Sequence, residues 1–356
     1  MPKVVVGMSG GVDSAVAAYL LQKEGAEVIG VTLRVWEADR EQSRCCEIDD
    51  ARSVCDLLGI PYYTFNCLSE FSKHVTEPFT ADYLAGKTPN PCILCNRYVK
   101  WERMLFEAKV LEADCIATGH YAKVTRLPNG RYTVRRAKHA AKDQTYMLWA
   151  LTQEQLAGTL MPLSDLSKDE VRKIASDAGI PVADKPDSQE ICFVPDGSYG
   201  AFVEAHAKSP LQKGFFVNGD GEVLGEHRGI WNYTPGQRKG LGIAFGEPMY
   251  VKEIRPSSNE VVLSAEDALF TREVFVERPN FLSVQGLEEG ESLPCLAKIR
   301  YQHPAQPAVI DCIGQDLLRL TFHEPVRAAA PGQSAVFYDE TGCVIGGGFI
   351  SRAEPG

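Results

Sequence analysis

A glycine-rich segment near the N-terminus joins a short apolar run to a helical pattern. Residues 4–6 are three valines, and such a run of β-branched residues predicts a buried strand. The chain continues as Gly7-Met8-Ser9-Gly10-Gly11-Val12-Asp13-Ser14, and a helix is expected to begin near Ser14. Glycines let backbone N–H groups approach an anion, and a helix N-terminus adds partial positive charge. The segment therefore predicts a phosphate site with serine hydroxyl donors, where Asp13 can bind a metal ion on the phosphates or cap the helix.

Two common phosphate-binding motifs do not account for this segment. A Walker A loop requires Gly-Lys-Ser/Thr, which is missing, and the glycine spacing is not Gly-x-Gly-x-x-Gly. Ser9-Gly10-Gly11-x-Asp13-Ser14 instead resembles the PP-loop of the ATP pyrophosphatases, which cut ATP between the α- and β-phosphates and form an adenylated intermediate. The alternative interpretation is an ordinary strand-to-helix turn capped by Asp or Ser.

Three cysteines lie in segments that could support thiol chemistry. Cys92 and Cys95 precede a helix expected to begin near Arg97, where the helix dipole would stabilise a thiolate. A Cys-x-x-Cys pair alone fits half of a zinc site, a redox pair or coincidence, and the sequence lacks the second pair of a zinc ribbon. Cys192 follows a polar loop, and by itself this position is typical of a buried core thiol.

Strand and helix patterns alternate through the first 120 residues and place the glycine-rich segment at the edge of a sheet. Further strands are expected at 27–33, 62–66 and 115–119, helices at 49–58, 71–84 and 97–112, and a loop at 86–96. Such alternation predicts a parallel sheet with helices on both faces. Gly7–Ser14, Leu33 and Gly119-His120 would then lie at the carboxyl ends of strands, where such sheets bind ligands.

A basic stretch and a later change of pattern mark the rest of the chain. Residues 123–142 predict a hairpin with seven Lys or Arg and no acidic residue, which favours contact with a phosphate backbone. Residues 167–170 form a capping box before a helix expected over 171–178. Beyond about residue 205, short segments separated by Gly, Pro and Asn predict β structure. We expect an α/β catalytic domain at 1–204, a small β-rich domain at 205–270 and a C-terminal β-barrel at 271–356.

Composition limits the function classes. The chain has 356 residues and a net charge of −10, which argues against a broadly basic nucleic-acid binder but allows a local cationic path. No apolar run approaches the length of a membrane span, and the N-terminus has no signal-peptide pattern. Eleven unevenly spaced cysteines fit a reducing compartment, so we expect a cytoplasmic protein.

Six motifs, in this order and spread over essentially the whole chain, resemble those of the tRNA-specific 2-thiouridylase family in the PP-loop ATP pyrophosphatase superfamily. They are Ser9-Gly10-Gly11-Val12-Asp13-Ser14, Asn90-Pro91-x-x-x-Cys95-Asn96, Ala117-Thr118-Gly119-His120-Tyr121, Lys142-Asp143-Gln144-x-Tyr146, Asp187-Ser188-x-x-Ile191-Cys192-Phe193 and Tyr233-Thr234-Pro235-Gly236-Gln237-Arg238-Lys239-Gly240-Leu241-Gly242. That family adds sulfur to C2 of the wobble uridine in tRNAs for lysine, glutamate and glutamine.

The resemblance implies roles for individual residues. ATP and Mg²⁺ would bind at Gly7–Ser14, Leu33 and Gly119, with Asp13 in catalysis. Cys95 would be the nucleophile, and Cys192 would carry a persulfide received from a cysteine desulfurase or relay protein. The two thiols would form a transient disulfide. Residues expected to contact the base or the tRNA anticodon stem-loop are Asn90, Pro91, Cys92, His120, Lys142, Asp143, Gln144, Arg300, Tyr301 and Gln333.

Some interpretations stay open. Many relatives have an acidic residue where this chain has Cys92, which would be a spare thiol, a base contact or a ligand of an iron–sulfur cluster. Cys95 and Cys192 are far apart in sequence, so we expect a mobile loop to bring Cys192 over Cys95 when tRNA binds. A PP-loop ligase that adenylates a small molecule would explain the α/β domain but not the thiols. An iron–sulfur RNA-binding protein, or a cluster-dependent tRNA thiolase, would use all three cysteines. The histidines show no metal-ligand spacing.

Overall fold

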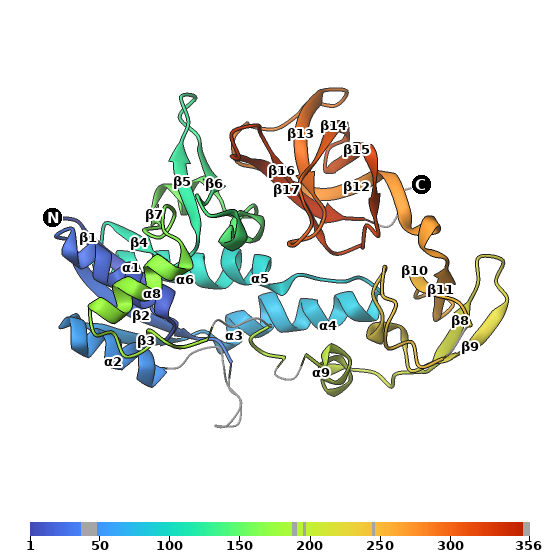
Figure 1. Ribbon diagram of the computed structural model, residues 1–356, viewed down its shortest axis with the longest axis horizontal. Coiled ribbons are helices and arrows are strands. Elements are labelled where there is room, and N and C mark those ends of the chain that lie inside the picture. The colour runs from blue at the N-terminus through green and yellow to red at the C-terminus, as the bar shows by residue number, and fades with distance from the viewer. Residues whose placement is uncertain (37–47, 187–190, 195–196, 244–245, 352–356) are drawn as a thin grey trace.

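The computed structural model describes residues 1–36, 48–186, 191–194, 197–243 and 246–351 (Figure 1). Its first part is a five-stranded sheet in the order β3-β2-β1-β4-β7, and every neighbouring pair of strands is parallel. A four-stranded sheet and a closed six-stranded barrel follow along the chain. The predicted fold class, α/β followed by a small β-rich domain and a β-barrel, is confirmed.

The α/β part contains the expected strands and helices together with several short elements. Its strands are β1 (Lys3–Gly7), β2 (Glu27–Arg34), β3 (Tyr62–Asn66), β4 (Cys115–Ala117), β5 (Ala122–Arg126), β6 (Tyr132–Arg136) and β7 (Thr159–Leu160). Its helices are α1 (Val12–Lys23), α2 (Ile48–Leu58), α3 (Leu68–Phe71), η1 (Ser72–Thr76), α4 (Glu77–Leu84), α5 (Pro91–Leu94), η2 (Cys95–Trp101), α6 (Glu102–Val110), η3 (Ala140–Lys142), η4 (Thr145–Met147), α7 (Gln153–Ala157), α8 (Lys168–Asp177) and α9 (Tyr199–His206).

Local sequence explains most of these boundaries. The three valines of β1 are fully buried between the layers, as their β-branched pattern predicts. The Ser167–Glu170 capping box is present at the start of α8, where each side chain bonds the backbone of the other. Helix α1 begins at Val12, two residues before the predicted start, with Gly11 at the N-cap.

The helix that carries the Cys-x-x-Cys pair begins earlier than predicted. Helical backbone runs without a break from Pro91 to Val110 through α5, η2 and α6. The predicted loop to residue 96 and helix start near Arg97 are therefore wrong. The side chain of Asn90 accepts a hydrogen bond from the backbone N–H of Cys92 at 3.2 Å, and Pro91 occupies the first helical position. Asn at the N-cap and Pro at the next position are a strong pair of helix-start signals.

The β-rich parts follow α9. The middle sheet has the order β10-β11-β8-β9, and the barrel has the order β12-β15-β14-β13-β16-β17. Their elements are β8 (Gly214–Val217), β9 (Val223–His227), η5 (Ile230–Asn232), β10 (Tyr250–Arg255), β11 (Glu260–Ser264), η6 (Glu266–Leu269), β12 (Phe270–Phe281), β13 (Ser292–Lys298), β14 (Gln306–Gly314), β15 (Leu317–Arg327), β16 (Ser334–Tyr338) and β17 (Val344–Ile350). Across the described residues, no helix combines the length and apolar character needed to cross a membrane.

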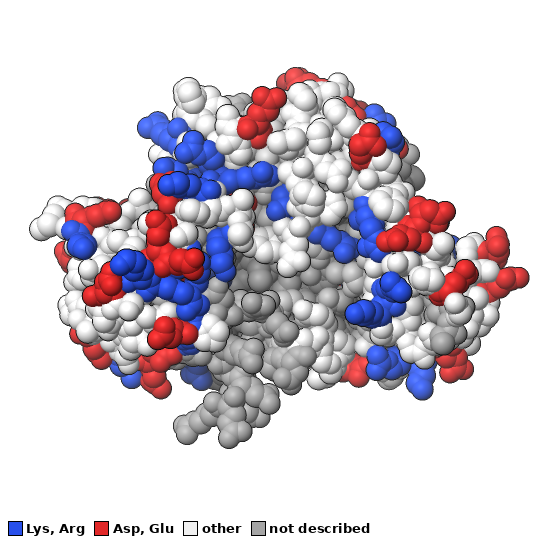
Figure 2. Space-filling view, viewed as in Figure 1, with Lys and Arg blue, Asp and Glu red and all other residues white. Residues whose placement is uncertain are grey.

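The basic hairpin β5–β6 connects the α/β part to the barrel. Arg131 donates hydrogen bonds at 2.8 Å to the backbone carbonyls of both Phe281 and Leu282. The guanidinium of Arg136 stacks on the ring of Tyr338 at 4.1 Å. Part of the basic stretch therefore holds two domains together instead of meeting solvent. Figure 2 shows other Lys and Arg side chains gathered over the hairpin on the face drawn, so a local cationic surface remains on this acidic chain.

Candidate active site

A cavity of about 230 Å³ opens where β1, β2 and β4 end. Seven of the residues predicted to bind nucleotide line it: Gly7, Met8, Ser9, Asp13, Ser14, Leu33 and Gly119. Sequence reasoning missed the other walls, which are formed by Val31, Val35, Lys100, Met104 and Thr118. Lys100 and Met104 are four residues apart on one helix and therefore share a face, a spacing that could have identified them. His120 and Gln144, predicted as tRNA contacts, also line this cavity.

The glycine-rich segment folds as a turn built around its two serines. The hydroxyl of Ser14 accepts a hydrogen bond from the backbone N–H of Ser9 at 3.2 Å and donates one to the carbonyl of Gly11 at 3.0 Å. Gly10 has a φ of 73°, a left-handed conformation that strongly favours glycine. The turn thus presents the N-terminus of α1, with its unpaired N–H groups, at the edge of the sheet.

Gly119 lets this turn pack against the end of β4. A Cβ atom at Gly119 would lie 2.8 Å from the carbonyl carbon of Asp13 and from the backbone nitrogen of Ser14. Real Cβ atoms essentially never approach backbone atoms this closely. The strand end and the phosphate-binding turn therefore depend on glycine for their contact, although 106 residues separate Asp13 from Gly119.

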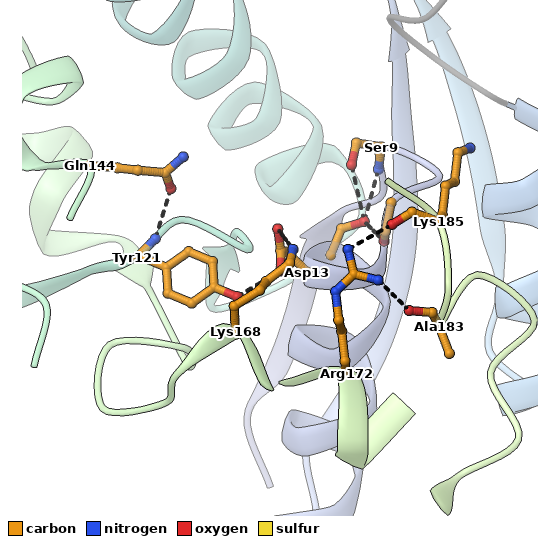
Figure 3. Close-up of polar contacts among 10 residues, drawn as sticks. Ser9, Asp13, Tyr121, Gln144, Lys168, Arg172, Ala183 and Lys185 are labelled. Atoms are coloured by element: carbon orange, nitrogen blue, oxygen red, sulfur yellow. Dashed lines mark hydrogen bonds and ion pairs between the residues drawn. The ribbon is translucent and has the colours of Figure 1, made fainter. Parts of the chain in front are cut away.

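Asp13 is held by two groups from later in the chain. Its carboxylate accepts hydrogen bonds from the ammonium of Lys168 at 2.7 and 2.8 Å and from the hydroxyl of Tyr121 at 2.7 Å (Figure 3). The helix cap is Gly11, and no side chain caps it, so Asp13 does not serve as the cap. A carboxylate beside a phosphate site is the kind of hard oxygen ligand that Mg²⁺ uses together with the phosphates themselves.

The three cysteines lie near the helix that begins at Pro91. Cys95 is buried, while Cys92 and Cys192 are partly exposed. Burial raises the pKa of the Cys92 thiol, Lys100 lowers it, and the nearby Cys192 raises it further. Cys192 therefore lies within electrostatic range of Cys92, and its predicted role as persulfide carrier stays a prediction. The net pKa of Cys92 is raised, which is opposite to the lowering that a helix N-terminus alone predicts.

His120 is kept neutral in the cavity wall. Burial and the charge of Lys100 lower the pKa of His120 to about 3. One ring nitrogen, Nδ1, lies 3.0 Å from the hydroxyl of Thr118, and the ring lies beside Trp101. His120 is thus a neutral hydrogen-bonding group that does not titrate near neutral pH.

Several residues predicted to contact tRNA or the target base serve internal contacts here. Asn90 caps α5 and also donates to the sulfur of Met147, while Pro91 is buried. Asp143 is buried and accepts hydrogen bonds from Thr145 and from the backbone of Ala137.

The neighbours of Asp143 are more accessible. Gln144 accepts a hydrogen bond from the backbone N–H of Tyr121 at 2.9 Å and reaches the cavity, and Lys142 ends the short helix η3 in a half-buried position. The buried Asp143 therefore fixes the Lys142-Asp143-Gln144 segment, and the side chains of the outer two residues are partly exposed.

The three predicted tRNA contacts of the C-terminal part lie at domain boundaries. Arg300 donates hydrogen bonds at 2.8 Å to the carbonyls of Pro235 and Ala328, and so joins the middle domain to the barrel. Gln333 donates to the carbonyl of Thr88 at 2.8 Å and joins the barrel to the α/β part. Tyr301 is half-buried, and burial raises its pKa. These three residues lie away from the cavity lining.

A metal cluster at Cys92, Cys95 and Cys192 requires several ligating side chains close together in the fold. In the parts of the chain that the structure describes, no three His, Cys, Asp or Glu side chains are grouped closely enough to hold a metal ion. The possible iron–sulfur cluster at Cys92, Cys95 and Cys192 stays a prediction. Asp187 and Ser188 of the fifth motif, and most of the predicted mobile loop before Cys192, lie outside the described residues.

Known proteins resemble this chain along its whole length. Three family models match in succession: the tRNA methyl transferase HUP domain at residues 2–196, the tRNA methyl transferase PRC-barrel domain at 200–265 and the aminomethyltransferase beta-barrel domain at 271–350. The predicted domain limits at 204 and 270 stay a prediction. Among solved structures, a 4-thiouridine synthetase in complex with RNA and ATP is 17% identical with a TM-score of 0.33, covering 57% of this chain and 50% of its own, a likeness too low to support an inference.

Curated relatives give the family. The tRNA-specific 2-thiouridylase MnmA of Lachnoclostridium phytofermentans is 50% identical over 99% of this chain and 100% of its own length. The enzyme of the same name from Clostridioides difficile is 47% identical over 99% of this chain and 98% of its own. With this identity over the full length, and with the six motifs in order, the chain belongs to the tRNA-specific 2-thiouridylase family.

Proposed function

We propose that this protein catalyses the ATP-dependent 2-thiolation of the wobble uridine of tRNA for lysine, glutamate and glutamine. The observation that carries the proposal is that one helix serves both halves of the reaction. The helical segment from Pro91 to Val110 bears Cys92 and Cys95 near its start, and its Lys100 and Met104 form a wall of the cavity that the PP-loop lines. This helix thus connects the predicted sulfur-bearing residues to the wall of the nucleotide cavity.

The first step is activation of the uridine. The O2 atom of uridine attacks the α-phosphorus of ATP, which forms an O2-adenylated base and releases pyrophosphate. Backbone N–H groups of the turn at 7–14 and the N-terminus of α1 stabilise the negative charge that builds on the phosphates. Mg²⁺, when bound beside Asp13, adds charge neutralisation at the phosphates. Gly119 and Leu33 would hold the adenosine end of the nucleotide, because both line the same cavity.

The second step delivers sulfur. A persulfide on Cys192, loaded by a cysteine desulfurase or relay protein, carries the terminal sulfur that replaces the AMP group at C2. Either this sulfur attacks C2 directly, AMP leaves, and the Cys95 thiolate then attacks the Cys192 sulfur to break the S–S bond and free the thiouridine, or the Cys95 thiolate first attacks the inner sulfur and releases hydrosulfide, which then attacks C2 and displaces AMP. Attack by Cys95 leaves a Cys95–Cys192 disulfide, and an external thiol must supply two electrons to restore both thiols. A tRNA substrate and the reduction of this disulfide by an external thiol both fit the reducing cytoplasm.

The wobble base must also leave its stack to reach the cavity. A base in the single-stranded anticodon loop unstacks at a lower cost than a base in a duplex. His120 and Gln144 stand in the cavity wall beside the PP-loop residues, and they are neutral hydrogen-bonding groups suited to a uridine edge. We assign them to the base or its ribose, with Cys92 close by.

The test is a complete thiolation reaction. Purified protein is incubated with ATP, Mg²⁺, a persulfide donor and unmodified lysine tRNA, and the digested tRNA is analysed for 2-thiouridine by mass spectrometry. Cys95→Ser and Cys192→Ser should each abolish product, whereas Cys295→Ser in the barrel should not reduce it. Cys92→Ala should still form product if the mechanism needs only two thiols. It should form none if the mechanism needs a three-cysteine cluster. Full thiolation by Cys192→Ser would refute the persulfide assignment. Cleavage of ATP to AMP without formation of thiouridine would indicate that the substrate is a small molecule.

A further inference from the structure

The phosphate-binding turn carries no positive charge of its own. Residues 7–14 include Asp13 but no Lys or Arg, whereas a Walker A loop supplies a lysine to the phosphates. A helix N-terminus contributes only about half of an elementary charge. An ATP triphosphate therefore calls for a cation from elsewhere in the chain.

Two lysines from after the hairpin reach the turn. Lys168, at the first position of α8, is committed to the carboxylate of Asp13 at 2.7 Å. Lys185 lies past the end of α8, and its ammonium donates to the carbonyl of Gly10 at 3.1 Å and pairs with Asp50 at 2.6 Å. Lys100 also lines the cavity, but it lies beside His120, whose pKa it lowers. Lys185 thus contacts the backbone of the turn at Gly10.

The fold fixes the backbone from which Lys185 projects. Arg172, on α8, donates hydrogen bonds to the carbonyl of Ala183 at 3.1 Å and to the carbonyl of Lys185 itself at 3.0 Å (Figure 3). The side chain of Lys185 is 25% exposed, and its ammonium lies against the turn at the Gly10 carbonyl. A long lysine side chain held at both ends has lost much of its conformational freedom before a ligand arrives.

We propose that Lys185 is the phosphate-binding cation of this site, and that its ammonium, held at the Gly10 carbonyl, contacts the β-phosphate of ATP and the pyrophosphate that leaves. This inference rests on the use of ATP in the proposed function. A phosphate oxygen is a stronger acceptor than a backbone carbonyl, so the ammonium exchanges part of its contact with Gly10 for the nucleotide.

The electrostatics of Lys185 agree with this assignment. Burial lowers the pKa of Lys185, even though the carboxylate of Asp50 is only 2.6 Å away. A bound polyphosphate brings negative charge to this ammonium, so its binding and the charged state of Lys185 stabilise each other.

Nucleotide binding tests the assignment without tRNA. Dissociation constants for ATP, pyrophosphate and AMP are measured by isothermal titration calorimetry on the full chain with constant Mg²⁺. Lys185→Gln should weaken ATP and pyrophosphate about 10- to 100-fold and change AMP less than about 2-fold, because AMP lacks the β-phosphate. Lys185→Arg keeps the charge and should recover most of the affinity. Lys173→Gln, an exposed lysine paired with Asp177 on α8, is the matched control.

Other outcomes overturn the proposal. Equal weakening of AMP and ATP by Lys185→Gln would mean that Lys185 only supports the turn, and unchanged ATP affinity would mean that it does not contact phosphate. Asp50→Asn removes the carboxylate partner and should leave ATP binding as tight or tighter. A loss with Asp50→Asn equal to that of Lys185→Gln would make the ion pair a structural anchor and contradict the assignment. A wild-type chain that binds ATP but does not thiolate tRNA would refute the proposed function and leave this inference standing.

Discussion

Gly119→Ala should weaken nucleotide binding through a steric effect alone. The added Cβ would meet two backbone atoms, the carbonyl carbon of Asp13 and the nitrogen of Ser14, at 2.8 Å. Neither atom belongs to a flexible side chain, so the strand end or the phosphate-binding turn must move. The backbone of Gly119 does not need a left-handed φ, so conformational strain at residue 119 itself does not contribute.

The size of the effect follows from the distance. The turn must retreat by about 0.6 Å to bring this contact to the lower edge of ordinary van der Waals distances. Inserting one methyl group into a well-packed site costs about 1–3 kcal/mol. If the turn takes up the displacement, the N–H groups at the start of α1 lose their alignment with the phosphates. ATP binding should then weaken about 5- to 150-fold.

The assay pairs calorimetry with a thermal melt, and Gly286→Ala is the control. A Cβ at Gly286 meets no atom within 4 Å, and its φ is not in the left-handed range, so this substitution should change neither affinity nor melting temperature. Gly119→Ala should weaken ATP and pyrophosphate together and lower the melting temperature. If Gly119→Ala bound ATP as tightly as the wild-type chain, the close packing of the strand end on the turn would not exist in solution.

Two further predictions concern the cavity wall and the domain boundary. The pKa of His120 is lowered to about 3 from 6.5, so the folded state resists protonation of this ring. The free energy of unfolding should therefore fall as the pH drops from about 6.5 toward 3. Denaturant melts at several pH values should show a flatter pH dependence for His120→Gln. A dependence unchanged in His120→Gln would contradict the buried neutral ring. Arg131→Ala removes two hydrogen bonds from the hairpin to the barrel carbonyls of Phe281 and Leu282 and should destabilise the contact by about 1–3 kcal/mol. Limited proteolysis between the domains should then be faster. The control Arg126→Ala, at an exposed residue, should not change the rate of proteolysis. Equal proteolysis of both variants would show that the contact does not hold the barrel.

Features that depend on local sequence could be predicted. The valines of β1, the glycine-rich turn and the capping box at Ser167 each lie within a few residues of the structure that they specify. The resulting parallel sheet brings Gly7, Leu33 and Gly119 to one edge, because the carboxyl ends of parallel strands meet there. The nucleotide cavity was therefore foreseeable without knowing any side-chain contact.

The start of the thiol-bearing helix was predictable but was misread. The Pro, Asn and Cys residues of 86–96 predict a loop, because Pro and Asn usually interrupt helices. Asn90 followed by Pro91 has the opposite meaning at a helix start, since Asn caps the helix and Pro lacks only an N–H that would have no helical partner. The misreading moved Cys95 outside a helix that contains it.

The contacts of Arg300 and Gln333 could not be derived from sequence pattern. Arg300 bonds a carbonyl 65 residues away, and Gln333 bonds one 245 residues away. Such contacts depend on how the domains dock, and no period or local motif records that docking. The tRNA roles of these two residues stay a prediction.

The π-helical segment η2 sets which residues of this helix share a face. In an α-helix each residue advances by 100°, so Lys100 would lie about 140° around the axis from Cys95. In η2 the backbone bonds join residues five apart, so Lys100 lies about one turn above Cys95 and shares its face. The segment places the thiol and the cavity-lining ammonium on one side of the helix, although the sequence between them has no Gly or Pro. Such π-helical turns are frequent at functional sites, and here the altered phase joins the sulfur-bearing end of the helix to the nucleotide cavity.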